Sequence, residues 1–471
     1  MVVTAELPLI FSAAALAVVA LSLSVPRPRA LTIVATVAAV LAVALPLVLA
    51  TAIDPARAAG RALWQWSAAG GPTIQASYRF DGIAAVGVAV GAAYAGAGLF
   101  GAARATKRHP LLPSAVLAIG LVFYALVVTE DLIAATVVLG VLASITILAT
   151  LAVAPLPATT RLAAYLAVGI QFFVLAALLV SRFGGASFRF DAIPSSSVSP
   201  GAILAGSVGA ALFAGLYPFI PWRFRVQLRA PELERLRGVV TMPAGAGASL
   251  ILLRLLGATR GDITSFPLPG ISPEWRLLAM VLAYVPAAIA AARDRRFPVR
   301  GATVATGVAV LLVAYPALHW SHVALIAAFI SVLYAATVSL ALPEQWEVVR
   351  YDVTLAALWI ALAVGTPTAI AGGLFILIAD AVSALAESIW TSPLASHIVV
   401  IAGSAAAVTG LAVIGLGSLA AQDGGAQGLA IVAVLAVAAL MLVHVGRRLD
   451  VADVPLALDG LAAAAALGVT V

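Results

Sequence analysis

Apolar windows of membrane-spanning length recur along the whole chain, and this repetition constrains the fold more than any other feature. They lie at residues 7–25, 31–51, 82–102, 112–129, 132–153, 162–181, 201–221, 239–257, 276–293, 301–318, 322–342, 352–388, 396–420 and 427–446. A helix of about 20 residues crosses the hydrocarbon core, and helices satisfy their own backbone polar groups there. The sequence therefore predicts an all-α polytopic membrane protein with about 14 transmembrane helices.

Composition excludes several classes of protein. Hydrophobic residues make up 63% of the 471 residues and charged residues only 10%, against about 45–50% and about 25% in soluble domains. This composition excludes a cytosolic globular enzyme, a disordered chain and a nucleic-acid binder. We expect residues 1–471 to form a single membrane domain. Because the chain has no cysteine, thiolate metal sites, iron–sulfur clusters and disulfides are excluded as well.

Basic residues predict the orientation in the membrane. They gather in loops that fall on one side when the N-terminus lies outside: Arg27, Arg29, Arg104, Lys107, Arg108, Arg223, Arg225, Arg229, Arg235, Arg237, Arg293, Arg295, Arg296 and Arg300. Such loops favour the cytoplasm, so we expect a multi-pass protein of the cytoplasmic (inner) membrane. The first window has no basic flank and is interpreted as a span rather than a signal peptide. Residues 451–471 are apolar but include Asp453 and Asp459, which favours a surface or partial helix.

Two predicted helices contain helix-breaking residues. Pro218 and Pro221 interrupt the seventh, and the twelfth contains Gly365, Pro367 and a Gly372–Gly373 pair that would unwind it near the middle of the membrane. Interrupted helices at corresponding places in two halves suggest an inverted repeat with a transport pathway at the break. Proline kinks and close packing at glycines are the alternative explanation.

The order of several motifs resembles a known family. Its hallmark, Pro-Phe-His-x-Trp-Leu-Pro-Asp-Ala-His-x-x-Ala-Pro, is matched without a gap by Pro218, Phe219, Trp222, Ala230 and Pro231. Weaker matches are "YRFDGIAAVGVAVG", "TEDLIAATVVLGVLASI", "RLAAYLAVGIQFF", "LILLRLLG" and "GTPTAIAGGLF", which include Asp81, Gly82, Tyr165 and Arg254. The chain resembles the antiporter-like membrane subunits of respiratory complex I, of Mrp-type cation/proton antiporters and of membrane-bound hydrogenases.

The resemblance covers about residues 70–390, and residues 391–471 add two further helices and an apolar C-terminal tail. It implies an inverted-repeat antiporter-like fold with discontinuous seventh and twelfth helices.

The family's proton relay is missing from this sequence. The resemblance places its fifth-helix glutamate at Gly140, its seventh-helix lysine at Phe213 and its eighth-helix lysine near Ala246, while the twelfth-helix position falls near Phe375 or Ile376. Apolar side chains can neither hold nor pass a proton. Because Lys107 is the only lysine in the chain, no shift of the alignment restores the relay.

One group of ionisable residues is a candidate ion path. Asp380 lies within an apolar window, where a charge is costly, and Ser383 and Glu387 lie three and seven residues further on, on the same helical face. They are interpreted as the polar lining of a residual half-channel. The alternative is a carboxyl that is neutral or paired with an arginine or a neighbouring subunit.

Three further candidates lie at the ends of windows. Glu130 and Asp131 precede the fifth window, where they either cap the helix or admit protons. His322 opens the eleventh and is either an interfacial residue or a proton carrier. No metal-binding spacing is found, and no cofactor is expected.

The function implied is that of a non-redox membrane subunit of a complex I-like, NADH dehydrogenase-like or hydrogenase-like assembly. It would act as a scaffold or a modified ion-translocation element and have no catalytic site of its own. Its partners would be sibling membrane subunits and the lipid bilayer, with a peripheral redox arm contacted only indirectly. The alternatives are a membrane subunit of an inorganic-carbon uptake complex, beside a zinc protein, or an independent secondary transporter.

Overall fold

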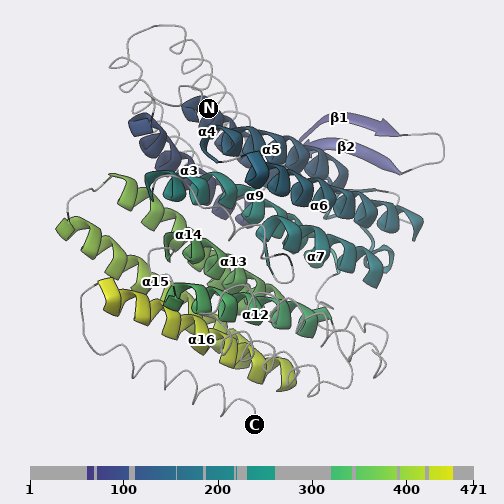
Figure 1. The fold of residues 1–471 in the computed structure, drawn as a ribbon. Helices are drawn as coiled ribbons and strands as arrows, with labels where there is room; N and C mark the ends of the chain where they lie inside the picture. The colour runs from purple at the N-terminus through teal and green to yellow at the C-terminus, as the bar shows by residue number, and fades with distance from the viewer. Residues whose placement is uncertain are drawn as a thin grey trace, which may run out of the picture. The chain divides into compact units, whose positions relative to one another are not determined.

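The computed structural model describes residues 61–67, 72–105, 112–154, 156–183, 187–216, 219, 231–259, 320–341, 346–389, 393–419 and 424–448. The chain divides into two compact units, and Figure 1 labels their helices and strands. The first comprises residues 1–215, 221–260 and 377–403, and the second comprises residues 216–220, 261–376 and 404–471.

The first unit is a helical bundle with one β-hairpin. Its elements are β1 (Arg61–Ser67), β2 (Thr73–Tyr78), α3 (Gly82–Ala105), α4 (Leu112–Val128), α5 (Leu132–Val153), α6 (Leu156–Arg182), the short 3-10 helix η2 (Ser195–Ser197), α7 (Pro200–Ala214) and α9 (Pro231–Gly257). Consecutive helices from α3 to α7 pack against one another, and α9 packs on α3, α4, α5 and α7. The predicted windows at 82–102, 112–129 and 132–153 match α3, α4 and α5 closely.

The second unit contains α12 (Trp320–Ala341), α13 (Trp346–Val364), the first part of α14 (Pro367–Ile389), most of α15 (Pro393–Leu419) and α16 (Gly424–Arg448). Helix α12 packs on α13 and α16. The predicted windows at 276–293 and 301–318 and the C-terminal tail lie outside the described residues, as do the first two windows. The total number of helices therefore stays a prediction.

Six helices of the described part are long and apolar enough to cross a membrane. They lie within Gly82–Ala102, Leu132–Leu151, Leu156–Arg182, Gly238–Gly257, Pro367–Ile389 and Ile401–Leu419. In α9, 94% of the apolar segment is buried within the protein, whereas in α6 only 33% is buried. The low value means that α6 presents apolar side chains outward, as a helix facing lipid does. The chain is thus a multi-pass membrane protein.

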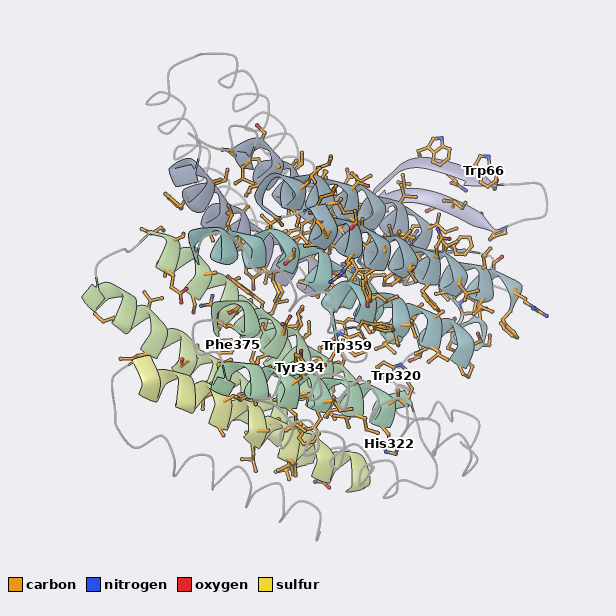
Figure 2. All side chains as sticks on the ribbon, viewed as in Figure 1. Trp66, Trp320, His322, Tyr334, Trp359 and Phe375 are labelled. Atoms are coloured by element: carbon orange, nitrogen blue, oxygen red, sulfur yellow. The ribbon has the colours of Figure 1, made fainter. Side chains whose placement is uncertain are left out.

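The β-hairpin was not predicted. Strands β1 and β2 pair antiparallel with Trp66 opposite Ile74, and the pairing shifts by one residue between Ala62 and Trp64. Trp64 and Trp66 are separated by one residue on β1, and both are exposed. Figure 2 labels Trp66 on this strand. The sequence offers a strand signal here in the alternation of Trp64, Gln65 and Trp66.

The end of α7 falls within the predicted seventh window. The helix stops at Ala214, because Gly215 takes the left-handed conformation (φ 64°) that favours glycine and ends helices. Of the predicted break motif, Pro218, Trp222 and Ala230 lie outside the described residues. Phe219 lies in a bend, and Pro231 begins α9. A discontinuous seventh helix therefore stays a prediction.

The long window at 352–388 belongs to two helices joined by a tight turn. Helix α13 ends at Val364, Gly365 has a φ of 73°, and α14 begins at Pro367. A Cβ placed on Gly373 would lie 2.6 Å from the Cβ of Ala361, so α14 folds back along α13.

The prediction that the chain unwinds at Gly372 and Gly373 is wrong, because both residues lie inside the continuous helix α14. The two glycines allow α14 to approach its neighbouring helices closely. A Cβ on Gly372 would lie 2.7 Å from the carbonyl oxygen of Gly410 in α15, and Gly373 faces α13. The alternative explanation, tight packing at glycines, describes these two residues.

Candidate functional site

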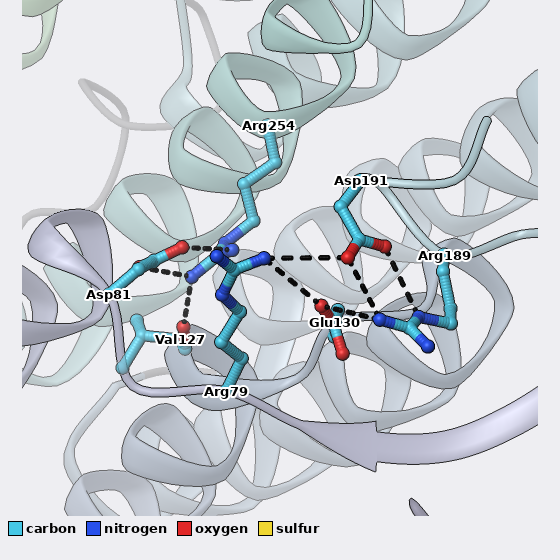
Figure 3. Close-up of polar contacts among 7 residues, drawn as sticks. All are labelled: Arg79, Asp81, Val127, Glu130, Arg189, Asp191 and Arg254. Carbon is cyan, nitrogen blue, oxygen red and sulfur yellow. Dashed lines mark hydrogen bonds and ion pairs between the residues drawn. The ribbon is translucent and has the colours of Figure 1, made fainter. Parts of the chain in front are cut away.

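One polar site in the first unit is a cluster of four charged side chains (Figure 3). Arg79 Nη1 lies 3.5 Å from Glu130 Oε1 and 3.4 Å from Asp191 Oδ2. Arg189 Nη2 lies 3.2 Å from the same Glu130 atom and 2.8 Å from Asp191 Oδ2. Two guanidinium groups thus share two carboxylates. We call Arg79, Glu130, Arg189 and Asp191 the four-charge cluster.

Backbone pairing fixes Glu130 in the centre of this cluster. Its amide donates to the carbonyl oxygen of Ser77 at 3.0 Å, and its own carbonyl accepts from the amide of Phe190 at 2.9 Å. The connection between α4 and α5 is therefore held between the end of β2 and the segment 187–191. This pairing buries Glu130. Its side chain is only 3% exposed, whereas those of Arg79 and Arg189 are about one-third exposed.

Burial raises the pKa of the Glu130 carboxyl, and the charge of Asp191 adds to that effect, while Arg189 opposes it. The upward shift of this pKa prevails because the two guanidinium groups are shared with Asp191 and are partly screened by water. Glu130 lies between α4 and α5, outside both apolar helices.

Replacing Glu130 with glutamine is expected to flatten the pH dependence of stability. A carboxyl whose pKa is raised in the folded protein adds stability below its ordinary value of 4.5. That stability is lost as the pH rises through the raised value. Thermal unfolding in detergent, measured from below pH 4.5 upward, should show stability declining with rising pH in the wild type. The decline should be smaller in Glu130→Gln. An equal decline in both proteins would contradict the assignment to Glu130.

Asp131 has the geometry of a helix cap. Its Oδ1 accepts from the amides of Ile133 at 2.9 Å and Ala134 at 3.0 Å, and its Oδ2 accepts from the amide of Gln75 at 3.1 Å. The residue is fully buried. Both carboxylate oxygens are therefore occupied by backbone donors, which favours the capping interpretation over proton entry.

Another ion pair, next to the cluster, joins three helices. Arg254 near the end of α9 donates from Nη1 to Asp81 Oδ2 at 2.8 Å and from Nη2 to Asp81 Oδ1 at 2.9 Å. Its Nη2 also donates to the carbonyl oxygen of Val127 at 2.9 Å. The Asp81 carboxylate accepts from the amide of Ala84 as well, at 2.8 Å. One side chain thus ties the start of α3 to the ends of α4 and α9.

A further polar contact joins α3 to α14. Tyr94 Oη donates a hydrogen bond of 2.6 Å to Oδ2 of Asp380, and both side chains are buried. Of the other two predicted residues of this path, Ser383 donates to the carbonyl oxygen of Ala379 in its own helix at 2.8 Å. Glu387 is half-buried and has a polar partner.

The degenerate relay positions have apolar surroundings in the described structure. Phe213 is buried and meets the ring of Phe173 edge to face, with ring centroids 6.4 Å apart. A Cβ on Gly169 of α6 would lie 2.7 Å from the Phe213 ring. Ala246 is fully buried, and the nearest atom to a Cβ on Gly140 would be Ile170 Cδ1 at 3.8 Å.

His322 lies in the first turn of α12, in the second unit, where it is buried and interacts with other residues (Figure 2). The described residues include no group of three or more histidine, cysteine, aspartate or glutamate side chains that could hold a metal ion.

The sequence indicated Asp380 and Glu130 as candidate residues but not the side chains that contact them. Tyr94 was not singled out, although a phenol in the middle of an apolar helix needs a polar partner and is a usable signal. Arg189 and Asp191 lie in a mixed loop without a pattern. Asp81 and Arg254 were noted as separate motif residues, and only the fold brings them together.

No model of a protein family matches the chain, and no curated protein does. Among solved structures, a chain of the Mrp complex from Dietzia sp. DQ12-45-1b has a TM-score of 0.66 at 12% identity, covering 95% of this chain and 80% of that one. A chain of respiratory complex I from Thermus thermophilus has a TM-score of 0.57 at 18% identity, covering 99% and 94%. A chain of an archaeal membrane-bound sulfane sulfur reductase has a TM-score of 0.59 at 12% identity, covering 99% and 94%.

At these identities the similarity concerns the fold, and it extends over nearly the whole chain. The structural neighbours come from three different membrane complexes, and the sequence motifs resemble membrane subunits of two of them, the Mrp complex and respiratory complex I. The protein is therefore a multi-pass membrane protein with the antiporter-like fold of the membrane subunits of these complexes.

Proposed function

We propose that this chain is a non-redox membrane subunit of a complex I-like or hydrogenase-like assembly. There it acts as a scaffold or as a modified ion-translocation element that lacks the lysine–glutamate relay. It would lie in the cytoplasmic membrane with its N-terminus outside. Its structural neighbours are subunits of multisubunit membrane complexes, which supports sibling membrane subunits as partners.

The observation that carries the proposal is the packing of Phe213. Where the resemblance places a relay lysine, an aromatic ring fills the space between α6 and α7 and contacts Phe173. A relay lysine works because its charge responds to neighbouring charges and to water. An aromatic ring that closes the same space offers neither a titratable group nor room for water, so ion movement, if it occurs in this chain, must use other residues.

Purification of the tagged chain from its native membranes in mild detergent tests the proposal. We expect it to elute with other membrane subunits and with a peripheral subunit that has a redox chromophore. Elution with a zinc protein and no redox subunit would instead favour an inorganic-carbon uptake complex. A lone chain that moves ions when reconstituted into vesicles would favour an independent secondary transporter, and either result would overturn the proposal.

Phe213→Leu is expected to leave the turnover and ion movement of the assembled complex within about twofold of the wild type. The reason is that replacing one apolar side chain with a smaller apolar one removes no proton carrier, and the small cavity it leaves lowers stability rather than ion movement. Phe173→Leu, which alters the partner ring, is the matched control. Turnover and ion flux are both measured in vesicles. A loss of ion movement in Phe213→Leu alone would show that this position still serves the relay.

A further inference from the structure

We propose that the outward face of α6, centred on Gln171, is the surface on which a transmembrane helix of a sibling subunit packs. This helix has an asparagine or glutamine that pairs with the Gln171 carboxamide. The inference deepens the proposed function, because it names the surface and the chemistry through which a sibling subunit binds. It rests on that function for the existence of the sibling subunit.

Helix α6 presents a row of exposed side chains outward. Ala164, Val168, Gln171, Leu175 and Leu178 are all exposed and follow one another at steps of three or four residues, which places them on one side of the helix. Only 33% of the apolar segment of α6 is buried within the protein. Gln171 is the polar side chain in this row, and a polar group is costly where a helix faces lipid alone.

Gln171 lies at the centre of the membrane-spanning part of α6. The nearest charged residues along the helix are Arg161, ten positions before it, and Arg182, eleven positions after it, and both are exposed. At about 1.5 Å per residue, each arginine lies on the order of 15 Å from Gln171 along the helix axis, which is half of a hydrocarbon core of about 30 Å. Arginines near helix ends reach the headgroups, so Gln171 lies at mid-depth.

A carboxamide at this depth needs a hydrogen-bonding partner that lipid cannot provide. It has two N–H donors and a carbonyl acceptor, whereas the hydrocarbon core has no group that pairs with them. Within the described residues, no hydrogen bond to the Gln171 carboxamide is found. Glutamine side chains in such positions form hydrogen bonds between transmembrane helices. The face therefore fits a second helix better than it fits lipid alone.

The complementary group comes from another chain. The best match to a carboxamide is a second carboxamide, because each N–H donates to the other carbonyl oxygen and no charge is brought to mid-depth. This chain has no asparagine. Its other glutamines lie outside the apolar windows or at the first residue of one: Gln65, Gln75, Gln227, Gln345, Gln422 and Gln427. No predicted helix of this chain can therefore place a second carboxamide at the depth of Gln171.

Helix α5 adds a hydroxyl close to this face. Ser144 is exposed and donates to the carbonyl oxygen of Gly140 in its own helix at 2.9 Å, so its oxygen can still accept a hydrogen bond from outside. A Cβ on Gly140, one turn before Ser144, would lie 3.8 Å from Cδ1 of Ile170, the residue before Gln171. Ser144 lies near the middle of α5, as Gln171 does in α6. One partner helix can therefore contact both polar groups.

Photo-crosslinking from α6 tests the surface. Because the chain has no cysteine, Val168→Cys, at an exposed position one turn before Gln171, provides the only site on this chain for benzophenone maleimide. After illumination of the labelled native membranes, we expect a covalent product with a membrane subunit that co-purifies with the tagged chain. Mass spectrometry should locate the link in an apolar segment of about 20 residues with an asparagine or glutamine within about one turn of the linked residue.

Leu435→Cys in α16 is the matched control, because its native side chain is 49% exposed against 47% for Val168. It should give no link to the segment that Val168→Cys reaches. A Val168→Cys product with lipid only, with a second copy of this chain or with another part of the same chain would overturn the inference.

Gln171→Leu distinguishes a contact between subunits from an amide that faces lipid. Loss of the hydrogen bond between the two helices should weaken retention of the sibling subunit in mild detergent roughly 3- to 30-fold. Gln171→Asn keeps a carboxamide and should lose less. Thr409→Val removes an exposed hydroxyl of α15 that is bonded within its own helix, and it should leave retention within about twofold of the wild type.

Thermal unfolding of the full chain checks that Gln171→Leu acts on the contact. The variant should unfold at the temperature of the wild type or above it, because it removes a polar group from apolar surroundings. Unchanged retention of the sibling subunit in Gln171→Leu would overturn the inference, as would equal losses in Gln171→Leu and Gln171→Asn.

The proposed function and this surface fail separately. If the chain purifies with membrane subunits and a redox subunit but Val168→Cys links only to lipid, the proposed function stands and the surface is wrong. If the chain purifies without a redox subunit but Val168→Cys links to an amide-containing segment of another membrane protein, the surface stands and the proposed function is wrong.

Discussion

Arg254→Ala is expected to lower the free energy of unfolding by about 3–5 kcal/mol, because it leaves a largely buried carboxylate without its partner. Arg254 makes two hydrogen bonds to Asp81 and one to the carbonyl oxygen of Val127. Its side chain is 7% exposed and that of Asp81 is 26% exposed, so water replaces these bonds poorly. Unfolding in a denaturing detergent titration measures the loss.

Two controls isolate the ion pair from a general effect of losing an arginine. Arg161→Ala removes an exposed arginine of α6 and should change stability by no more than about 0.5 kcal/mol. The double variant Asp81→Asn with Arg254→Met should be more stable than Arg254→Ala, because neither charge is left unpaired. A loss below about 1 kcal/mol in Arg254→Ala would show that this contact does not hold the three helices together.

Gly417→Ala is the second substitution with a large expected effect, about 3 kcal/mol of destabilisation from overpacking. A Cβ at this position of α15 would lie 2.5 Å from the backbone nitrogen of Ala369 and 2.9 Å from its Cα. Backbone atoms at the start of α14 cannot move aside as a side chain can. The hydroxyl of Thr366 also donates to the carbonyl oxygen of Gly417 at 3.0 Å, and a displaced α15 would lose that bond.

Gly415→Ala is the matched control, two residues earlier in the same helix. There a Cβ would meet nothing closer than Val434 Cγ1 at 3.9 Å. Because alanine favours helices over glycine by up to about 1 kcal/mol, this variant should be neutral or slightly more stable. Similar stability of the two variants in thermal unfolding would mean that α14 and α15 do not approach as closely as Gly417 requires.

The helices were predictable because the apolar windows are long and their ends are marked. The window at 132–153 begins after Asp131, whose capping side chain fixes the first residue of α5, and it matches Leu132–Val153. The window at 201–221 ran too far, since Gly215 takes a left-handed conformation that an apolar pattern does not reveal. The turn at Gly365 was predicted as an interruption, but the sequence did not distinguish a kink from a reversal of direction.

Contacts between distant segments were less predictable than the helices. Asp380 was identified because a carboxyl in an apolar window is conspicuous, but its partner Tyr94 lies 286 positions away. Glu130 was identified by its place before a helix, and the cluster around it depends on the hairpin and on the segment 187–191. Such pairings are set by packing, which hydrophobic periodicity does not specify.

The ring of Phe213 against Phe173 also has a consequence for the membrane as a whole. A protein that lies in an energy-storing membrane must not let that membrane discharge. A bare charge at the centre of a lipid-embedded helix costs at least about 2.5–3.5 kcal/mol, and the two rings in this contact supply no polar group to lower that cost. In the proposed assembly, this contact would insulate the membrane, and ions would cross only where another group admits them.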